Sequence, residues 1–171
     1  MKKYLMLVPA ILFPYISFGI FWHLDGEKSG FGGLLLGIIM AFLVCFACTL
    51  VFSVICVKRQ VGSTQIMNAA RIVKLLHIPA YLLVFLWGFL SMGMTATMIM
   101  LPIGAASLFV CWLLDVFCII VSGMVSSVAY YRAWREGKII LARALISAIL
   151  SFVFCVDVII VLIGFAGTKK D

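Results

Sequence analysis

Residues 79–131 read PAYLLVFLWGFLSMGMTATMIMLPIGAASLFVCWLLDVFCIIVSGMVSSVAYY, a run in which Asp115 is the only charged side chain. A lipid hydrocarbon core about 30 Å thick is crossed by about 20 helical residues. The run is therefore too long for one crossing and suits two. Proline and glycine favour turns, so we expect the break at Leu101-Pro102-Ile103-Gly104, between spans at 79–101 and 103–131.

Three further apolar runs, at 4–22, 31–57 and 139–166, complete the pattern. Of all residues 66% are hydrophobic and 11% charged, whereas about a quarter are charged in a soluble globular domain. The sequence predicts an all-α integral membrane bundle of five transmembrane helices, forming a single domain over residues 1–171. A cleaved signal peptide is the alternative for the first run. An uncleaved span is favoured, because no small-residue cleavage site follows the apolar core.

Pro9 and Pro14 should kink the first span. A membrane helix tolerates such a proline when neighbouring groups bond the backbone carbonyls that it frees.

The cations predict the orientation, because Lys and Arg mark the cytoplasmic side. The amino terminus and the loops after the second and fourth spans form one side. Ten of the 13 Lys and Arg residues fall there: Lys2, Lys3, Lys58, Arg59, Arg71, Lys74, Arg132, Arg135, Lys138 and Arg143. The other side holds Lys28, Lys169 and Lys170. We expect the amino terminus inside and the carboxyl terminus outside, in a bacterial plasma membrane.

Residues 63–77 allow two interpretations. Asn68, Arg71 and Lys74 recur every third residue, opposite an apolar face of Ile66, Ala70, Val73 and Leu76. This pattern is typical of a short amphipathic helix on the inner leaflet. The segment would equally serve as a cytoplasmic extension of the third span. Ser63 or Thr64 is expected to cap its start.

Small residues recur at every fourth position of the second span and form a packing track: Gly33, Gly37, Ala41, Cys45, Thr49 and Ser53. Helices in lipid associate through close packing, which small residues permit. The partner of this track lies either within the chain, which we favour, or in a second copy. A second track, Cys111, Asp115, Cys118, Ser122 and Ser126, predicts that Asp115 faces the bundle interior.

Asp115 and Asp157 are candidates for an intramembrane polar site. An unpaired carboxylate in hydrocarbon is costly, so each should be protonated, hydrogen-bonded or bound to a cation. One interpretation is a proton or cation site. The other is a neutral acid that joins helices.

The sequence contains no recognised catalytic, metal-binding or phosphate-binding motif. We therefore expect no cofactor, no metal and no nucleic-acid partner. Cys45-Phe-Ala-Cys48 lies within a span without a second cysteine pair, and no nucleophile elbow, zinc-protease or phosphate-loop motif occurs. The leading hypothesis is a non-enzymatic protein that acts through helix–helix contacts as an accessory, assembly or immunity-type component. Its partners would be the lipid bilayer and another membrane protein or a second copy. A small proton- or cation-coupled carrier is the alternative, and an enzyme acting on lipid is a weaker third.

Three phrases carry a family resemblance: Lys74-Leu-Leu-His-Ile-Pro-Ala-Tyr81, Trp112-Leu-Leu-Asp115 and Phe152-Val-Phe-Cys-Val-Asp-Val158. Residues 70–160 resemble an uncharacterised family of small bacterial multi-pass membrane proteins. The resemblance implies no activity. It adds His77 to Asp115 and Asp157 as residues to test.

Overall fold

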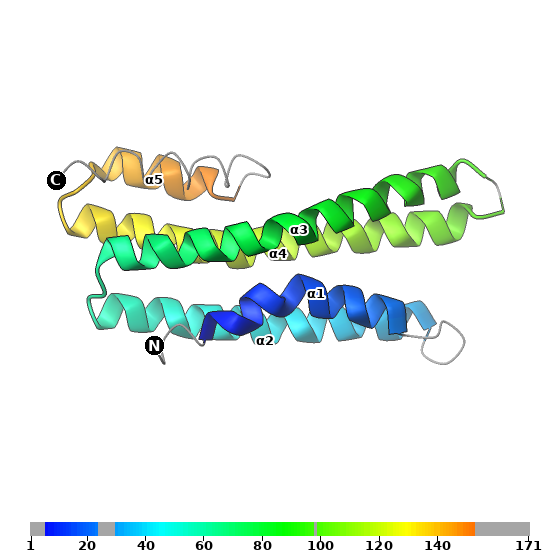
Figure 1. Cartoon of the computed structure of the whole chain (residues 1–171), viewed down its shortest axis with the longest axis horizontal. Helices are drawn as coiled ribbons and strands as arrows, with labels where there is room; N and C mark the ends of the chain where they lie inside the picture. Colours follow the sequence, from blue (N-terminus) through cyan, green and yellow to red (C-terminus); the bar gives the residue numbers. More distant parts are fainter. Residues whose placement is uncertain (1–5, 24–29, 98, 153–171) are drawn as a thin grey trace.

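The computed structural model describes residues 6–23, 30–97 and 99–152. The helices found there are α1 (Val8–His23), α2 (Gly30–Lys58), α3 (Ser63–Thr95), α4 (Leu101–Arg135) and α5 (Leu141–Leu150). They run along a common long axis, and α5 folds back along α4 (Figure 1). The described residues contain no strand, which confirms the all-helical prediction for this part of the chain.

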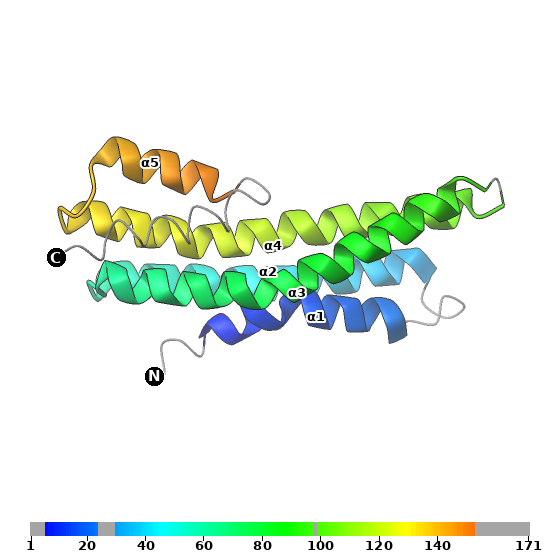
Figure 2. The same ribbon diagram turned by 45° about the horizontal axis from the view of Figure 1, so that its top comes forward.

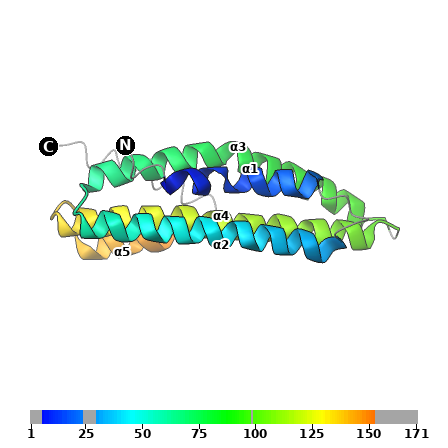
Figure 3. The same cartoon turned by 90° about the horizontal axis from the view of Figure 1, so that it is seen from below.

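The helices pack in two layers, with α1 and α3 in one layer and α2, α4 and α5 in the other (Figure 3). Two clusters of buried side chains join them. The first brings together α2, α3, α4 and α5 through residues such as Phe52, Ile66, Val125 and Ala144. The second joins α1, α2 and α4 through Phe13, Leu34, Ile38, Cys45, Val110, Leu114 and Cys118.

Three helices, α2, α3 and α4, are long and apolar enough to cross a membrane. Their outward faces carry large apolar side chains: Leu36 is 62% exposed, Phe85 67% and Phe89 69%. Apolar faces of this extent suit contact with lipid or another protein better than contact with water. The described parts of α1 and α5 are shorter apolar helices, and the second half of the fifth expected span, residues 153–166, lies outside the described residues.

The connections from α2 to α3 and from α4 to α5 lie at one end of the bundle, and the α3–α4 turn lies at the other (Figure 2). We call the first end the basic end, because Lys58, Arg59, Arg132, Arg135 and Lys138 lie in or beside these connections.

Residues 63–77 belong to the continuous 33-residue helix α3 and do not form a separate short helix, which agrees with the interpretation as an extension of the expected third span. Ile66, Ala70 and Val73 are buried, as expected, whereas Leu76 is 44% exposed. The expected polar face is wrong at Lys74, which is only 2% exposed. Lys74 turns inward because the buried stripe of this tightly packed helix is wider than the apolar pattern suggested.

The α3–α4 break lies earlier than predicted. Helix α3 ends at Thr95, and α4 already begins at Leu101. Threonines close the end of α3, where the Thr95 and Thr97 hydroxyls donate to the Met92 and Met94 carbonyls at 2.7 and 2.9 Å. Pro102 falls in the first turn of α4, where its missing N–H costs no helical hydrogen bond. The Pro–Gly segment thus starts a helix instead of forming the turn.

Gly104 permits a close approach of α3 and α4. A Cβ atom there would lie 2.7 Å from Thr95 Cγ2, 2.8 Å from Thr95 N and 2.9 Å from the Ser91 carbonyl oxygen. Two of these atoms belong to backbone and cannot rotate away.

We expect Gly104→Ala to destabilise the protein by about 1–3 kcal/mol, because the two helices must separate to admit the methyl group. The measurement is thermal unfolding of detergent-solubilised protein. Gly88→Ala is the matched control, since a Cβ at Gly88 meets nothing within 4 Å. Equal melting temperatures for the two variants would contradict the close approach.

Candidate functional site

A proline of α1 and a histidine of α3 meet inside the bundle. Pro14 has no N–H, so the carbonyl of Ala10, four residues earlier, loses its partner within the helix. His77 is only 1% exposed, and its Nε2 lies 3.0 Å from the Ala10 carbonyl oxygen. A carbonyl only accepts hydrogen bonds, so Nε2 carries the proton and donates. His77 therefore covers a carbonyl freed by a proline, as the sequence led us to expect for a kinked membrane helix.

The same crossing contains a hydrogen bond in the opposite direction. Pro79 interrupts α3, and Tyr15 of α1 donates its hydroxyl to the Leu76 carbonyl of α3, in the turn before that proline, at 2.6 Å. The Tyr81 and His77 rings meet edge to face, with centroids 6.0 Å apart. The two proline-containing helices thus each donate one side-chain hydrogen bond to the backbone of the other.

The two candidate carboxylates do not form a described pair. Asp115 is half-buried on α4, between the buried Cys111 and Cys118. Within the described ranges its carboxylate forms no hydrogen bond or ion pair. Asp157 lies outside the described residues, so its relation to Asp115 stays a prediction. His77 bonds α1 and is not joined to Asp115 by any described hydrogen bond.

The small-residue track of α2 lies against α1 over part of its length. The Cys45 thiol donates to the Pro9 carbonyl at 3.2 Å, and a Cβ at Gly37 would lie 3.5 Å from Ile20 Cγ2. Cys45, Thr49 and Ser53 are buried, whereas Gly33, Gly37 and Ala41 are partly exposed. The Thr49 and Ser53 hydroxyls donate to carbonyls of their own helix, at 2.8 Å each. They consequently act as small packing residues and form no described polar bond to another helix.

Nearer the turn end, α3 and α4 share a polar cluster that the sequence analysis missed. Trp87 Nε1 donates to Ser107 Oγ at 2.7 Å, the Ser91 hydroxyl donates to the Trp87 carbonyl at 2.8 Å, and the Ser91 and Ser107 hydroxyls share a hydrogen bond of 2.8 Å. Ser91 and Ser107 are buried. This cluster fastens the same helix pair that Gly104 brings together.

At the basic end, Glu136 caps a helix to which it does not belong. Its Oε1 accepts the Ser63 backbone N–H at 2.8 Å, and its Oε2 accepts the Ser63 hydroxyl at 2.6 Å. The expected capping by Ser63 or Thr64 is therefore wrong. Gly62 occupies the capping position, without a side-chain cap, and Ser63 is a donor to Glu136. The carboxylate also suits the positive end of the α3 dipole.

Two cations complete this contact. Lys138 Nζ lies 2.9 Å from Glu136 Oε2, and Arg132 NH2 lies 3.5 Å from Oε1. Arg132 Nε also donates to the Val61 carbonyl at 3.1 Å. The α2–α3 and α4–α5 connections are thereby held together. The sequence offered one signal, a single acidic residue among the cations that follow the fourth span.

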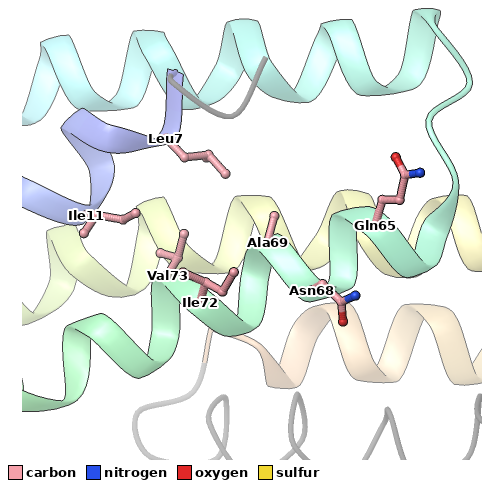
Figure 4. A pocket seen from close by; sticks show the side chains of 7 residues that line it. All are labelled: Leu7, Ile11, Gln65, Asn68, Ala69, Ile72 and Val73. Carbon is pink, nitrogen blue, oxygen red and sulfur yellow. The ribbon is translucent and has the colours of Figure 1, made fainter. Parts of the chain in front are cut away.

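Two hollows open beside the basic end. One, of about 280 Å³, lies between α1 and α3 and is lined by Leu7, Ile11, Gln65, Asn68, Ala69, Ile72 and Val73 (Figure 4). The other, of about 320 Å³, lies between α2 and α4 and is lined by Ser53, Val54, Val57, Lys58 and Val128. In the part of the chain that the structure describes, no three His, Cys, Asp or Glu side chains gather as a metal ion would require.

We expect His77→Phe to lower the free energy of unfolding by about 1–3 kcal/mol, because the buried Ala10 carbonyl loses its donor. Pro14→Ala restores an N–H to α1 and should remove part of that cost. The measurement is a double-mutant cycle of thermal unfolding in detergent. A coupling energy of at least about 0.5 kcal/mol is expected for groups that share a partner. Strictly additive effects would show that His77 does not serve this carbonyl.

The Glu136 contact predicts a loss of stability in acid. Partial burial raises the pKa of the Glu136 carboxyl, but hydrogen bonds from Ser63 and Lys138 outweigh it, and the pKa lies below its ordinary value of 4.5. A group with a lowered pKa stabilises the fold fully above its unfolded-state pKa, and this contribution disappears as the pH falls through the folded-state value. The melting temperature of the wild-type protein should therefore decrease as the pH is lowered below about 4.5. Glu136→Gln should melt lower at pH 7 and approach wild type in acid. A constant difference at all pH values would contradict this assignment.

The chain was compared with known proteins, and no family model, curated protein or solved structure matches it. The resemblance to a family of small multi-pass membrane proteins stays a prediction, and function must be argued from the geometry.

Proposed function

We propose that this chain is a non-enzymatic multi-pass protein of a bacterial plasma membrane that acts through helix–helix contacts as an accessory, assembly or immunity-type component. It would cross the membrane five times, with the amino terminus and the basic end in the cytoplasm. The gathering of ten cations on that side of the chain supports this orientation.

One observation carries the proposal: polar side chains form hydrogen bonds between helices, while the outer faces of α2 and α3 stay apolar. His77 and Tyr15 join α1 to α3, and Ser107 joins α4 to α3. Such bonds fix the helices relative to one another. A rigid bundle with uncovered apolar faces is suited to contact with another membrane helix.

Exposed positions of α2 recur with helical spacing and would form the contact face: Leu36, Met40, Leu43, Val44 and Val51. Residues that are three or four positions apart are neighbours on the surface of a helix. This apolar face is continuous along the helix.

A proton- or cation-coupled carrier is the second candidate. It is favoured by the half-buried Asp115 carboxylate, which has no hydrogen bond or ion pair within the described ranges. A carboxylate in that position would bind a proton or a cation in order to remain in hydrocarbon.

Photo-crosslinking in cells tests the contact function. A photoreactive residue at Leu43, which is 50% exposed, should give an adduct with a second membrane protein. The same residue at Ile38, which is fully buried, is the control and should give no such adduct. A reporter fused after residue 60 should lie in the cytoplasm.

The carrier is tested on purified protein in liposomes that contain a pH-sensitive dye. Proton flux that Asp115→Asn abolishes, with no adduct at Leu43, would reject the contact function in favour of the carrier. An adduct at Leu43 without flux would support the contact function.

A further inference from the structure

The hollow between α2 and α4 combines apolar walls with a lysine at one end. Val54, Val57 and Val128 provide the walls, and Lys58 is the last residue of α2. Its volume of about 320 Å³ falls at the lower end of the range for small-molecule sites, about 300–1,000 Å³. Only apolar atoms line the hollow, so Lys58 contributes the stem of its side chain and its ammonium lies outside the lining, at the basic end of the bundle.

Positive charge at this end is in excess of the described negative charge. Glu136 is the only acidic residue that the described ranges hold there, and it is already bound by Ser63, Lys138 and Arg132. Within these ranges Lys58, Arg59 and Arg135 form no hydrogen bond or ion pair through their side chains. These three cations are available to an outside anion.

The spacing along α4 brings one of these cations to the side of the hollow. Val128, which lines it, and Arg135 are seven residues apart, or two helical turns, and so share a face of α4. Lys58, at the end of α2, lines the hollow from the other helix, and Arg59 follows it directly in sequence. The hollow is therefore bordered by cations from two helices at the end where its walls stop.

We propose that this hollow binds an anionic phospholipid of the inner leaflet, with its phosphate at Lys58 and part of an acyl chain against Val54, Val57 and Val128. The inference rests on the proposed insertion of the chain with the basic end inside. Basic pockets between helices on the cytoplasmic side suit anionic headgroups, and a lysine stem lies along apolar surface while its ammonium reaches the headgroup level. A soluble anion would make no contact with the apolar walls, and an apolar partner helix would provide no negative charge for the cations.

The hollow between α1 and α3 is the internal control. Its walls are apolar too, but its polar lining consists of the uncharged amides of Gln65 and Asn68 (Figure 4). It should not distinguish an anionic from a zwitterionic headgroup.

The experiment is native mass spectrometry of the full-length protein in detergent, titrated with dioleoylphosphatidylglycerol or dioleoylphosphatidylcholine. The wild-type protein should bind the anionic phosphatidylglycerol more tightly than the zwitterionic phosphatidylcholine. Lys58→Gln should weaken the affinity for the anionic lipid about fivefold, which is the effect of one basic residue near an anionic headgroup. Arg143→Gln, which removes an exposed charge from α5 outside this lining, should leave it unchanged.

Filling the hollow gives an independent test. Val57→Trp should reduce binding of the anionic lipid, whereas Ile72→Trp, which fills the other hollow, should not. Equal binding of the two lipids by wild type, or equal losses in Lys58→Gln and Arg143→Gln, would overturn the proposal. So would a dimer, without bound lipid, that Val57→Trp dissociates. Recovery of the chain without detergent would instead refute the proposed membrane function.

Discussion

Pairing of backbone carbonyls in apolar surroundings is the constraint on which the arrangement of α1 and α3 depends. An unpaired polar backbone group in hydrocarbon costs several kcal/mol, so a proline in a buried helix requires a donor from elsewhere. Pro14 creates this requirement at Ala10, and His77 meets it from α3. The bond between His77 and the Ala10 carbonyl holds α1 in place along α3. Tyr15, donating to Leu76, holds the same crossing from the other side.

Close packing joins the remaining helices, as is expected of a bundle in lipid, where there is no hydrophobic drive between helices. Gly104 lets α4 approach the backbone of α3, and Cys45 of α2 reaches the Pro9 carbonyl of α1. The hydroxyls of Thr49 and Ser53 instead bond their own helix. A small polar residue can therefore serve an interface by its size alone, with its hydroxyl satisfied locally.

Hydropathy was sufficient to predict the helices, whereas the positions of their ends and the hydrogen bonds between residues far apart in sequence could be seen only in the structure. The length of the apolar run at 79–131 required two helices, but hydropathy does not place the end of α3 at Thr95, where threonine hydroxyls bond carbonyls of the last turn. Periodicity placed Lys74 on the polar face, and packing against neighbouring helices buries it. His77 was singled out without its role, because the carbonyl that it serves lies 67 residues away in sequence. Glu136 was missed for the same reason, since its partner Ser63 lies 73 residues away.

Helix ends of opposite polarity lie together at the basic end, and the charged side chains there complement the helix dipoles. Helices α2 and α4 finish there, and their last turns contain Lys58, Arg132 and Arg135, where cations suit the negative end of a helix dipole. Helix α3 begins there with no acidic residue in its first turn, so its positive end needs a carboxylate from elsewhere. Glu136, directly after α4, supplies it. One acidic residue thus satisfies the start of α3, while the remaining cations keep the excess positive charge on which the proposed orientation rests.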